Sequence, residues 1–456
     1  MVSQITADPS LLQGGYPQEV QEGASAHSPP AGVRGPMLAI IFFCTGLISY
    51  WGNASIATQL GYLSQGIVGL LGVMIVISIF ASRVPVVFTR EMLMASGFCA
   101  WALLGYPGAS QHQVASDGLK TLLKLLPMAF VVANAVNGRR AFLWLVAAVV
   151  VTTIAASLGG ASGLARGVEV ATDAGGREQR IQGLFGNPNG LGKLCCLALW
   201  AGASLLLISR GKLAKAALIG GLGFIVVTIG LTGSRQAMIG LFLLIVALYW
   251  YVLRRTSTRA GGKVVWAIVI GGVLAAAILY MSTTPFWKRM ETMLGTASSS
   301  RMESSAGARA AFMRKSLEVA LHNPMLGVGY DCVSYELGRL GGSSLRSPHN
   351  TFLGLAANTG FIGWGLFYGG WAFLLLRIRS VSRLPLPRTD FVLVRCLCLL
   401  QVLLLFWGVA ATLVNYKLFW VVSAASLGYL VWLERTYRPW VQETYEAPVY
   451  TPVPAY

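Results

Sequence analysis

Charged residues are scarce in this chain of 456 residues. They make up 11% of it, whereas a soluble domain carries about 25%. Hydrophobic residues make up 55%, and the mean hydropathy is +0.64. A membrane-crossing helix needs about 20 mostly apolar residues, and apolar runs of about this length recur along the sequence. The composition therefore excludes an ordinary soluble protein and predicts an all-α, polytopic membrane protein.

Acidic residues, cysteines and histidines are also few. The chain has 17 acidic and 35 basic residues, which gives a net charge of +18. Such a charge on a soluble protein would suggest a nucleic-acid ligand, but here most basic residues lie in short loops between apolar runs, as the positive-inside rule requires. The seven cysteines contain no CxxC pair, so neither a disulfide framework nor a metal site follows. We expect no nucleic-acid partner, no metal and no cofactor.

Twelve apolar runs can be recognised. They do not alternate as the strands of a membrane β-barrel do, and backbone groups in lipid must be satisfied internally, so each run is predicted to be a helix. The runs are 37–52, 62–82, 91–106, 119–137, 141–158, 189–208, 213–231, 237–253, 264–281, 351–376, 391–411 and 416–433.

Basic residues set the predicted topology. Every even-numbered connection is basic, which places these loops and both termini in the cytoplasm. The expected organisation is a disordered cytoplasmic tail (1–36), nine membrane helices (37–281), a large periplasmic loop with amphipathic helices (282–350), three more membrane helices (351–433) and a second cytoplasmic tail (434–456). The first segment lacks the basic start and apolar core of a signal peptide. We expect a multi-pass protein of a bacterial inner membrane, surrounded by membrane lipids.

Some cations lie on the predicted outer side, against the positive-inside rule. Arg180 precedes the sixth predicted helix and Lys193 lies within it. Arg235 lies in a short outer turn, and Arg309 lies in the large loop. Cations near lipid are costly and commonly mark function, although long side chains can also reach the headgroups. Their convergence predicts a phosphate or pyrophosphate ligand, which arginine binds in a bidentate fork.

The large loop also supplies polar groups for chemistry. Residues 304–321 have the spacing of an amphipathic helix, and Arg309 falls on its apolar face with Met313 and Leu317. His349 directly precedes the tenth apolar run, where a neutral imidazole can take a proton from a hydroxyl. A cap for the following helix is the alternative interpretation of His349. Asp331 and Glu336 are alternative bases.

Three motifs resemble the bacterial O-antigen ligase and O-antigen polymerase superfamily of membrane glycosyltransferases. The first is RIQGLFGNPNGLGKL (Arg180–Leu194), and the second is LTGSRQAMIGL (Leu231–Leu241). The third joins the helical Arg309 to PMLGVGYD (Pro324–Asp331) and HNTFLGLAANTGFIGWGLF (His349–Phe367). The layout of twelve helices with one large outer loop is also similar to that of the superfamily.

The resemblance implies a donor glycan carried on undecaprenyl pyrophosphate and an acceptor that is either a second glycan or lipid A–core. It implies that Arg235 and Arg309 hold the pyrophosphate, with Arg180 as a further cation, and that His349 activates the acceptor. Lys193, Tyr330, Asp331 and Asn350 lie in the same motifs and are expected to bind substrate. The motifs do not separate a ligase from a polymerase of O-antigen or exopolysaccharide, and a polymerase would add a chain-length regulator as partner.

The sequence is also compatible with two other classes of protein. A transporter or flippase for polysaccharide or its lipid-linked precursor would carry charged residues near the bilayer midplane on Gly- or Pro-broken helices in both halves, and the sequence has no such pair. A non-enzymatic envelope assembly protein would need no histidine between loop and helix. An inverting displacement is expected, because the sequence lacks the carboxylate pair and covalent nucleophile of a retaining hydrolase.

Overall fold

The computed structural model describes residues 34–51, 69–82, 85–165, 181, 188–253, 300–340 and 348–446. Within these ranges the regular elements are helices. They are α2 (Arg34–Trp51), a short helix at Gly69–Ala81, α4 (Arg90–Leu104), α5 (His112–Ala135), α6 (Arg139–Ala165), α7 (Pro188–Ile208), α8 (Lys212–Thr232), α9 (Arg235–Ala247) followed by the π-helical η3 (Leu248–Leu253), α13 (Ser300–His322), α14 (Val333–Leu340), α15 (Thr351–Val381), α16 (Arg388–Ala410) and α17 (Lys417–Glu446).

Helices occupy the predicted apolar runs wherever the structure describes them. Seven of these helices, α5, α6, α7, α8, α15, α16 and α17, are long and apolar enough to cross a membrane. The described ranges of the chain are thus helical, as in an integral membrane protein. The run at 264–281 lies outside the described residues, so the count of twelve spans and the sidedness of the loops stay predictions.

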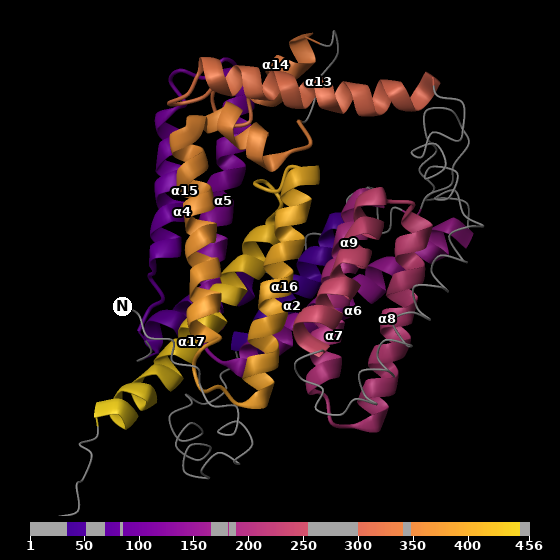
Figure 1. Ribbon diagram of the computed structural model, residues 1–456, viewed down its shortest axis with the longest axis vertical. Coiled ribbons are helices and arrows are strands. Elements are labelled where there is room, and N and C mark those ends of the chain that lie inside the picture. Colours follow the sequence, from indigo (N-terminus) through magenta and orange to yellow (C-terminus); the bar gives the residue numbers. More distant parts are fainter. Residues whose placement is uncertain are drawn as a thin grey trace, which may run out of the picture.

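The long helices form a bundle, and α13 lies across one end of it (Figure 1). Within the bundle, α4 packs along α15, and α5 packs along α17. A second group is made by α2, α6, α7, α8 and α9, with α16 between the two groups. The end covered by α13 carries the polar segments between α4 and α5, between α13 and α15, and between α16 and α17.

The apolar face of α13 differs from the predicted one. Phe312, Val319 and Ala320 pack in a small core with α14 and α15, and Ser316 between them is buried. Leu317, which the spacing assigned to the apolar face, is 43% exposed, and Leu321, four residues later, is 61% exposed. The small side chains of Ser316 and Ala320 let α13 approach α15 closely, so the buried stripe is rotated away from the larger leucines.

Glycine 360 interrupts α15 within the third motif. Its φ of 66° departs from helical geometry, so the carbonyl groups just before it lose their helical partners. The chain at 324–329 supplies new ones: Val328 N–H donates to Ala357 O at 2.9 Å, and Gly329 N–H donates to Asn358 O at 3.1 Å. The glycine-rich turn of the loop is therefore bound to the break in α15 by backbone hydrogen bonds.

Only glycine fits at the centre of this junction. A Cβ at Gly360 would overlap the Met325 carbonyl, and a Cβ at Gly327 would overlap the backbone of Asn358. Both glycines also have positive φ, which other residues adopt at a cost. The glycines of PMLGVGYD and of Thr-Gly-x-x-Gly thus hold the large loop against α15.

Candidate functional site

A polar cavity of about 230 Å³ lies at the end of the bundle that α13 covers. It is formed by the segment after the glycine-rich turn, the start of α15 and the connector between α16 and α17, residues 411–416. Its lining residues are Tyr330, Asp331, Val333, Ser334, Pro348, Thr351, Gly354, Leu355, Asn358, Thr412, Val414 and Asn415. Hydroxyl, amide and carboxyl groups thus share one small space.

Asn415 joins two loop residues in this cavity. The hydroxyl of the buried Tyr330 donates to Asn415 Oδ1 at 2.6 Å. Asn415 Nδ2 in turn lies 3.4 Å from Asp331 Oδ2, to which it donates. A carboxylate only accepts, whereas a phenol hydroxyl can donate, so the Asn415 amide is assigned with its NH₂ group toward Asp331 and its oxygen toward Tyr330.

Asp331 is held in an unusual environment. Its φ of 66° lies in the left-handed region, which aspartate tolerates better than most residues. Gly118 of α5 lies directly behind it, and a Cβ there would come within 2.9 Å of the Asp331 Cβ. Burial raises the pKa of the Asp331 carboxyl above its ordinary value, because desolvation penalises the charged form.

Hydrogen bonds tie the cavity walls to one another. The Thr351 hydroxyl donates to Ala411 O at 2.6 Å and accepts from Leu413 N–H at 2.9 Å, which fastens the connector to the start of α15. Asn358 Oδ1 accepts from Val333 N–H at 2.8 Å, which fastens the start of α14 to α15. The lining groups are therefore held on a rigid frame, as a preorganised site requires.

The first two motifs meet each other at the start of α9. Ser234 caps α9 by accepting from Ala237 N–H at 3.4 Å, and its hydroxyl donates to Asn189 Oδ1 at 2.9 Å. Gly192 permits this contact, since a Cβ there would lie 2.7 Å from the Ala237 Cβ. The turn that carries Arg235 is thus packed on the segment that carries Lys193.

Lys193 connects these two motifs with the polar cavity. Its Nζ lies 5.3 Å from the ring centroid of Tyr416, a cation–π contact. Tyr416 directly follows Asn415, whose amide contacts Tyr330 and Asp331. In the connector 411–416, Tyr416 therefore contacts a cation of the first motif, and Asn415 contacts polar groups of the third motif.

The structure places the other predicted residues as follows. His349 is exposed and has a φ of 50°, while its neighbours Pro348 and Thr351 line the cavity. The cap of α15 is Asn350, whose Oδ1 accepts from Leu353 N–H at 3.0 Å, so the cap that was one interpretation of His349 is supplied by the next residue.

Three predicted arginines fall partly or wholly outside the described parts of the chain. Arg180 lies outside the described residues. Arg235 is the first residue of α9 and Arg309 lies within α13, but the side chains of both are outside what the structure describes. The roles of all these residues stay predictions.

The connector 411–416 was not predicted as part of the site. It is a short polar turn between two apolar runs, and such turns are common in membrane proteins. An asparagine followed by an aromatic residue at a predicted outer helix end was a weak signal, and no motif included it. The connector contributes to the site through contacts with residues that are distant in the chain. Tyr330, which contacts Asn415, lies 85 positions before it, and Lys193 lies more than 200 positions before its partner Tyr416.

Comparison with known families agrees with the motif analysis. The O-antigen ligase family model matches residues 197–368, which include the whole of the second and third motifs. This match confirms the resemblance to the O-antigen ligase and polymerase superfamily. No curated protein matches the chain. The family match supports a glycan-transfer function in O-antigen biosynthesis, carried out by an integral membrane protein.

Proposed function

We propose that this relative of the O-antigen ligases is a membrane glycosyltransferase that acts at the outer, periplasmic face of a bacterial inner membrane. Its donor would be a glycan on undecaprenyl pyrophosphate, and its acceptor would be a hydroxyl of a second glycan or of lipid A–core. One observation carries the proposal. A cavity with hydroxyl, amide and carboxyl groups is connected through residues 415 and 416 to the cationic first motif.

The chemistry of each part fits a transfer from pyrophosphate. An acceptor hydroxyl oxygen attacks the anomeric carbon, and the bond from that carbon to the pyrophosphate oxygen breaks. The bonding electrons leave with the pyrophosphate, and the hydroxyl proton passes to His349. Arg235, Arg309 and Arg180 would stabilise the charge that develops on the leaving group, and direct displacement inverts the anomeric centre.

The polar cavity would receive the acceptor sugar. Asp331 and the Asn415 amide can accept from and donate to sugar hydroxyls, and Thr351 and Ser334 add further hydroxyl groups. Asn350 would act by capping α15 beside His349, and Tyr330 by orienting Asn415. Lys193 would extend the cationic side of the site toward the cavity.

The break in α15 does not favour the transporter alternative. Broken helices of transporters expose backbone groups to an ion or substrate. In this chain, three carbonyl groups at the break accept hydrogen bonds from Val328, Gly329 and the indole of Trp101. These carbonyl groups therefore accept hydrogen bonds from the protein itself and are not directed at an ion or substrate.

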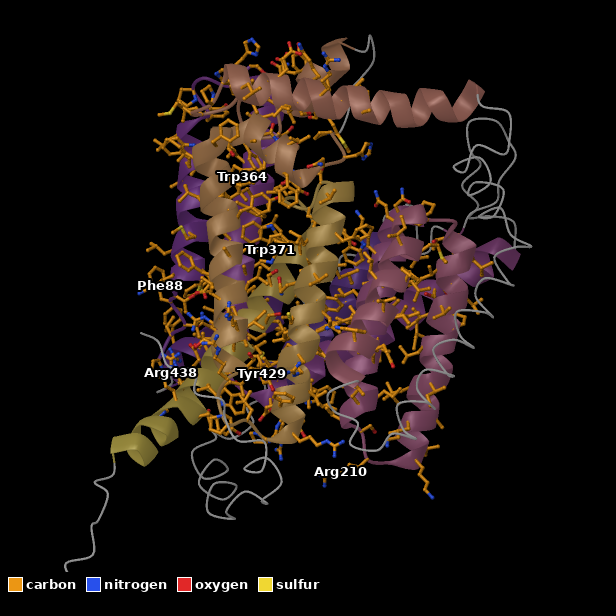
Figure 2. The ribbon with its side chains drawn as sticks, viewed as in Figure 1. Phe88, Arg210, Trp364, Trp371, Tyr429 and Arg438 are labelled. Atoms are coloured by element: carbon orange, nitrogen blue, oxygen red, sulfur yellow. The ribbon has the colours of Figure 1, made fainter. Side chains whose placement is uncertain are left out.

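A reconstituted assay tests the proposal. Purified protein in liposomes is given an undecaprenyl-pyrophosphate glycan donor and, in parallel, a second lipid-linked glycan or lipid A–core as acceptor. We expect Arg235→Ala, Arg309→Ala and His349→Ala each to lower turnover at least about 100-fold. Arg210→Ala, at the opposite end of the bundle (Figure 2), is the matched control and should keep full turnover.

The acceptor that supports transfer identifies a ligase or a polymerase. Wild-type turnover in all three variants would refute the site. Movement of the donor across the liposome membrane without transfer would refute the enzyme and favour the transporter.

A further inference from the structure

A second, larger cavity lies within the bundle. Its volume is about 420 Å³, and four helices line it: α4 and α15, which pack along each other, and α5 and α17, which form the other packed pair. The cavity is the space between these two pairs. Its lining residues are Phe88, Glu91, Met92, Ala95, Ser96, Leu126, Pro127, Ala129, Phe130, Val131, Phe367, Gly370, Trp371, Leu374, Phe419, Trp420, Ser423, Ala424 and Leu427.

Aromatic side chains separate this apolar cavity from the polar one. The ring of Phe367 lies 5.3 Å from that of Phe98 and 5.6 Å from that of Phe419, measured between centroids. Phe98 in turn contacts the ring of Tyr330, whose hydroxyl faces the polar cavity. A molecule in the apolar cavity is therefore shielded from the groups proposed to carry out transfer.

An ion-pair network closes the opposite end. Arg377 of α15 donates to both carboxylate oxygens of Glu91, at 2.7 and 3.2 Å, and pairs with Glu434 of α17. Glu91 lines the cavity, but its charge is neutralised by this bidentate pair. The network joins the two helix pairs below the cavity and leaves the lining effectively apolar.

The cavity opens at the side of the bundle, on a surface that we expect to face lipid. Phe88 is 67% exposed and Pro127 of α5 is also exposed, and both belong to the lining. Three of the four surrounding helices are long and apolar enough to cross a membrane. An apolar space that opens laterally at this level can accept a hydrocarbon chain, and water would find few polar partners there.

Positive charge gathers at the same end of the cavity as Phe88. Arg435 donates to Pro85 O at 2.8 Å and to Val86 O at 3.4 Å, and Arg90 is exposed directly after the same stretch. Figure 2 places Arg438 on the same flank as Phe88, nearer the end of the bundle that α13 does not cover. This part of the chain holds four arginines, at positions 90, 377, 435 and 438, and two glutamates, at positions 91 and 434. Arg377 pairs with both glutamates and Arg438 pairs with Glu434, whereas Arg435 donates to backbone carbonyl groups.

We infer that this cavity binds one acyl chain of an anionic phospholipid, with the lipid phosphate at Arg90 and Arg435. The apolar lining and lateral opening select a hydrocarbon chain, and the excess of arginine at the opening selects a negative headgroup. The lipid would be a resident component that fills the space between the α4–α15 and α5–α17 pairs. The inference does not depend on the proposed transferase activity, because the aromatic side chains separate the two cavities.

Thermal unfolding of the full-length protein in detergent tests the inference. Added phosphatidylglycerol should raise the midpoint of the wild type by about 2–4 °C more than phosphatidylcholine does. Ala129→Phe fills the cavity from α5 and should abolish this difference. Leu123→Phe is the matched control, because Leu123 is on the same helix, 44% exposed and not part of the lining. Arg435→Gln should reduce the difference while keeping a response to both lipids.

Native mass spectrometry gives a second readout that does not depend on the unfolding transition. The wild type should retain a phosphatidylglycerol molecule that Ala129→Phe loses, and Ala95→Leu is the replacement variant if Ala129→Phe does not fold. Equal shifts with both phospholipids would overturn the headgroup assignment. An undiminished phosphatidylglycerol response in the cavity-filling variant would overturn the site. A larger shift with undecaprenyl phosphate than with phosphatidylglycerol would replace the phospholipid by a polyprenyl lipid.

Discussion

The buried hydroxyl of Tyr330 donates to Asn415 Oδ1 at 2.6 Å, and this bond turns the Asn415 amide so that its nitrogen faces Asp331. One residue of the short α16–α17 connector is thereby linked to the third motif. The next residue, Tyr416, carries the Lys193 ammonium over its ring. The connector thus joins the first and third motifs.

Tyr330→Phe should lower both stability and transfer. It keeps the ring that packs on Phe98 but leaves Asn415 Oδ1 without its donor, at a cost of about 1–3 kcal/mol. Chemical unfolding measures this loss. The freed amide can rotate, so we expect KM for the acceptor to rise more than kcat falls. Tyr106→Phe, a ring that contacts His112 instead, is the control. An unchanged acceptor KM would contradict a positioning role for Asn415.

Asp331→Asn should change how stability depends on pH. Burial raises the folded-state pKa of Asp331 above its ordinary value of 3.8. Between these two values the folded protein holds a proton that the unfolded chain has released, so wild-type stability falls as pH rises through that window. The Asp331→Asn variant has no carboxyl group to titrate at this position, so it lacks this loss of stability. Thermal unfolding from pH 3.5 upward should show the two proteins converging at low pH and the variant gaining relative stability as pH rises.

A parallel pair of curves would mean that Asp331 has the same pKa in the folded and unfolded chain. The pH series is best run on the purified protein without substrate, so that ligand binding does not shift the unfolding equilibrium.

Gly360→Ala should loosen the loop from α15. The alanine methyl would overlap the Met325 carbonyl and would require a left-handed backbone, which costs about 1–3 kcal/mol from strain alone. Gly365→Ala on the same helix is the matched control, since nothing lies within 4 Å of a Cβ there. It should be neutral or stabilising by about 0.5–1 kcal/mol. Proteolysis between α13 and α15 reports the loosening, and equal resistance of both variants would contradict it.

Arg377→Gln should destabilise the bundle by about 3–5 kcal/mol, because it leaves the buried Glu91 without its cation, while Glu434 keeps only its pair with Arg438. Arg379→Gln, an exposed change two residues later, should alter stability by less than about 0.5 kcal/mol. Unfolding in detergent at fixed lipid content compares the two. Restoration of stability by Glu91→Gln in the Arg377→Gln background would show that the unpaired carboxylate is the cause.

The sequence determined the helices, because an apolar run of sufficient length in lipid has few alternatives to a helix. It also indicated the glycine-rich motif and the polar residues that flank it. It could not show that Gly327 and Gly360 face each other, since their contact depends on how the loop folds back on α15. The apolar stripe of α13 was displaced for a similar reason: close approach to α15 selects small residues over large ones.

Tertiary structure decided which polar residues share a cavity. Tyr330 and Asp331 were expected from their motif, but Asn415 and Tyr416 became visible only when the end of α16 was placed beside the start of α15. The apolar cavity between the two helix pairs is likewise a property of packing, to which each helix contributes one face. The local sequence determines which face of each segment can be buried. The contacts between distant segments determine where cavities remain between the buried faces.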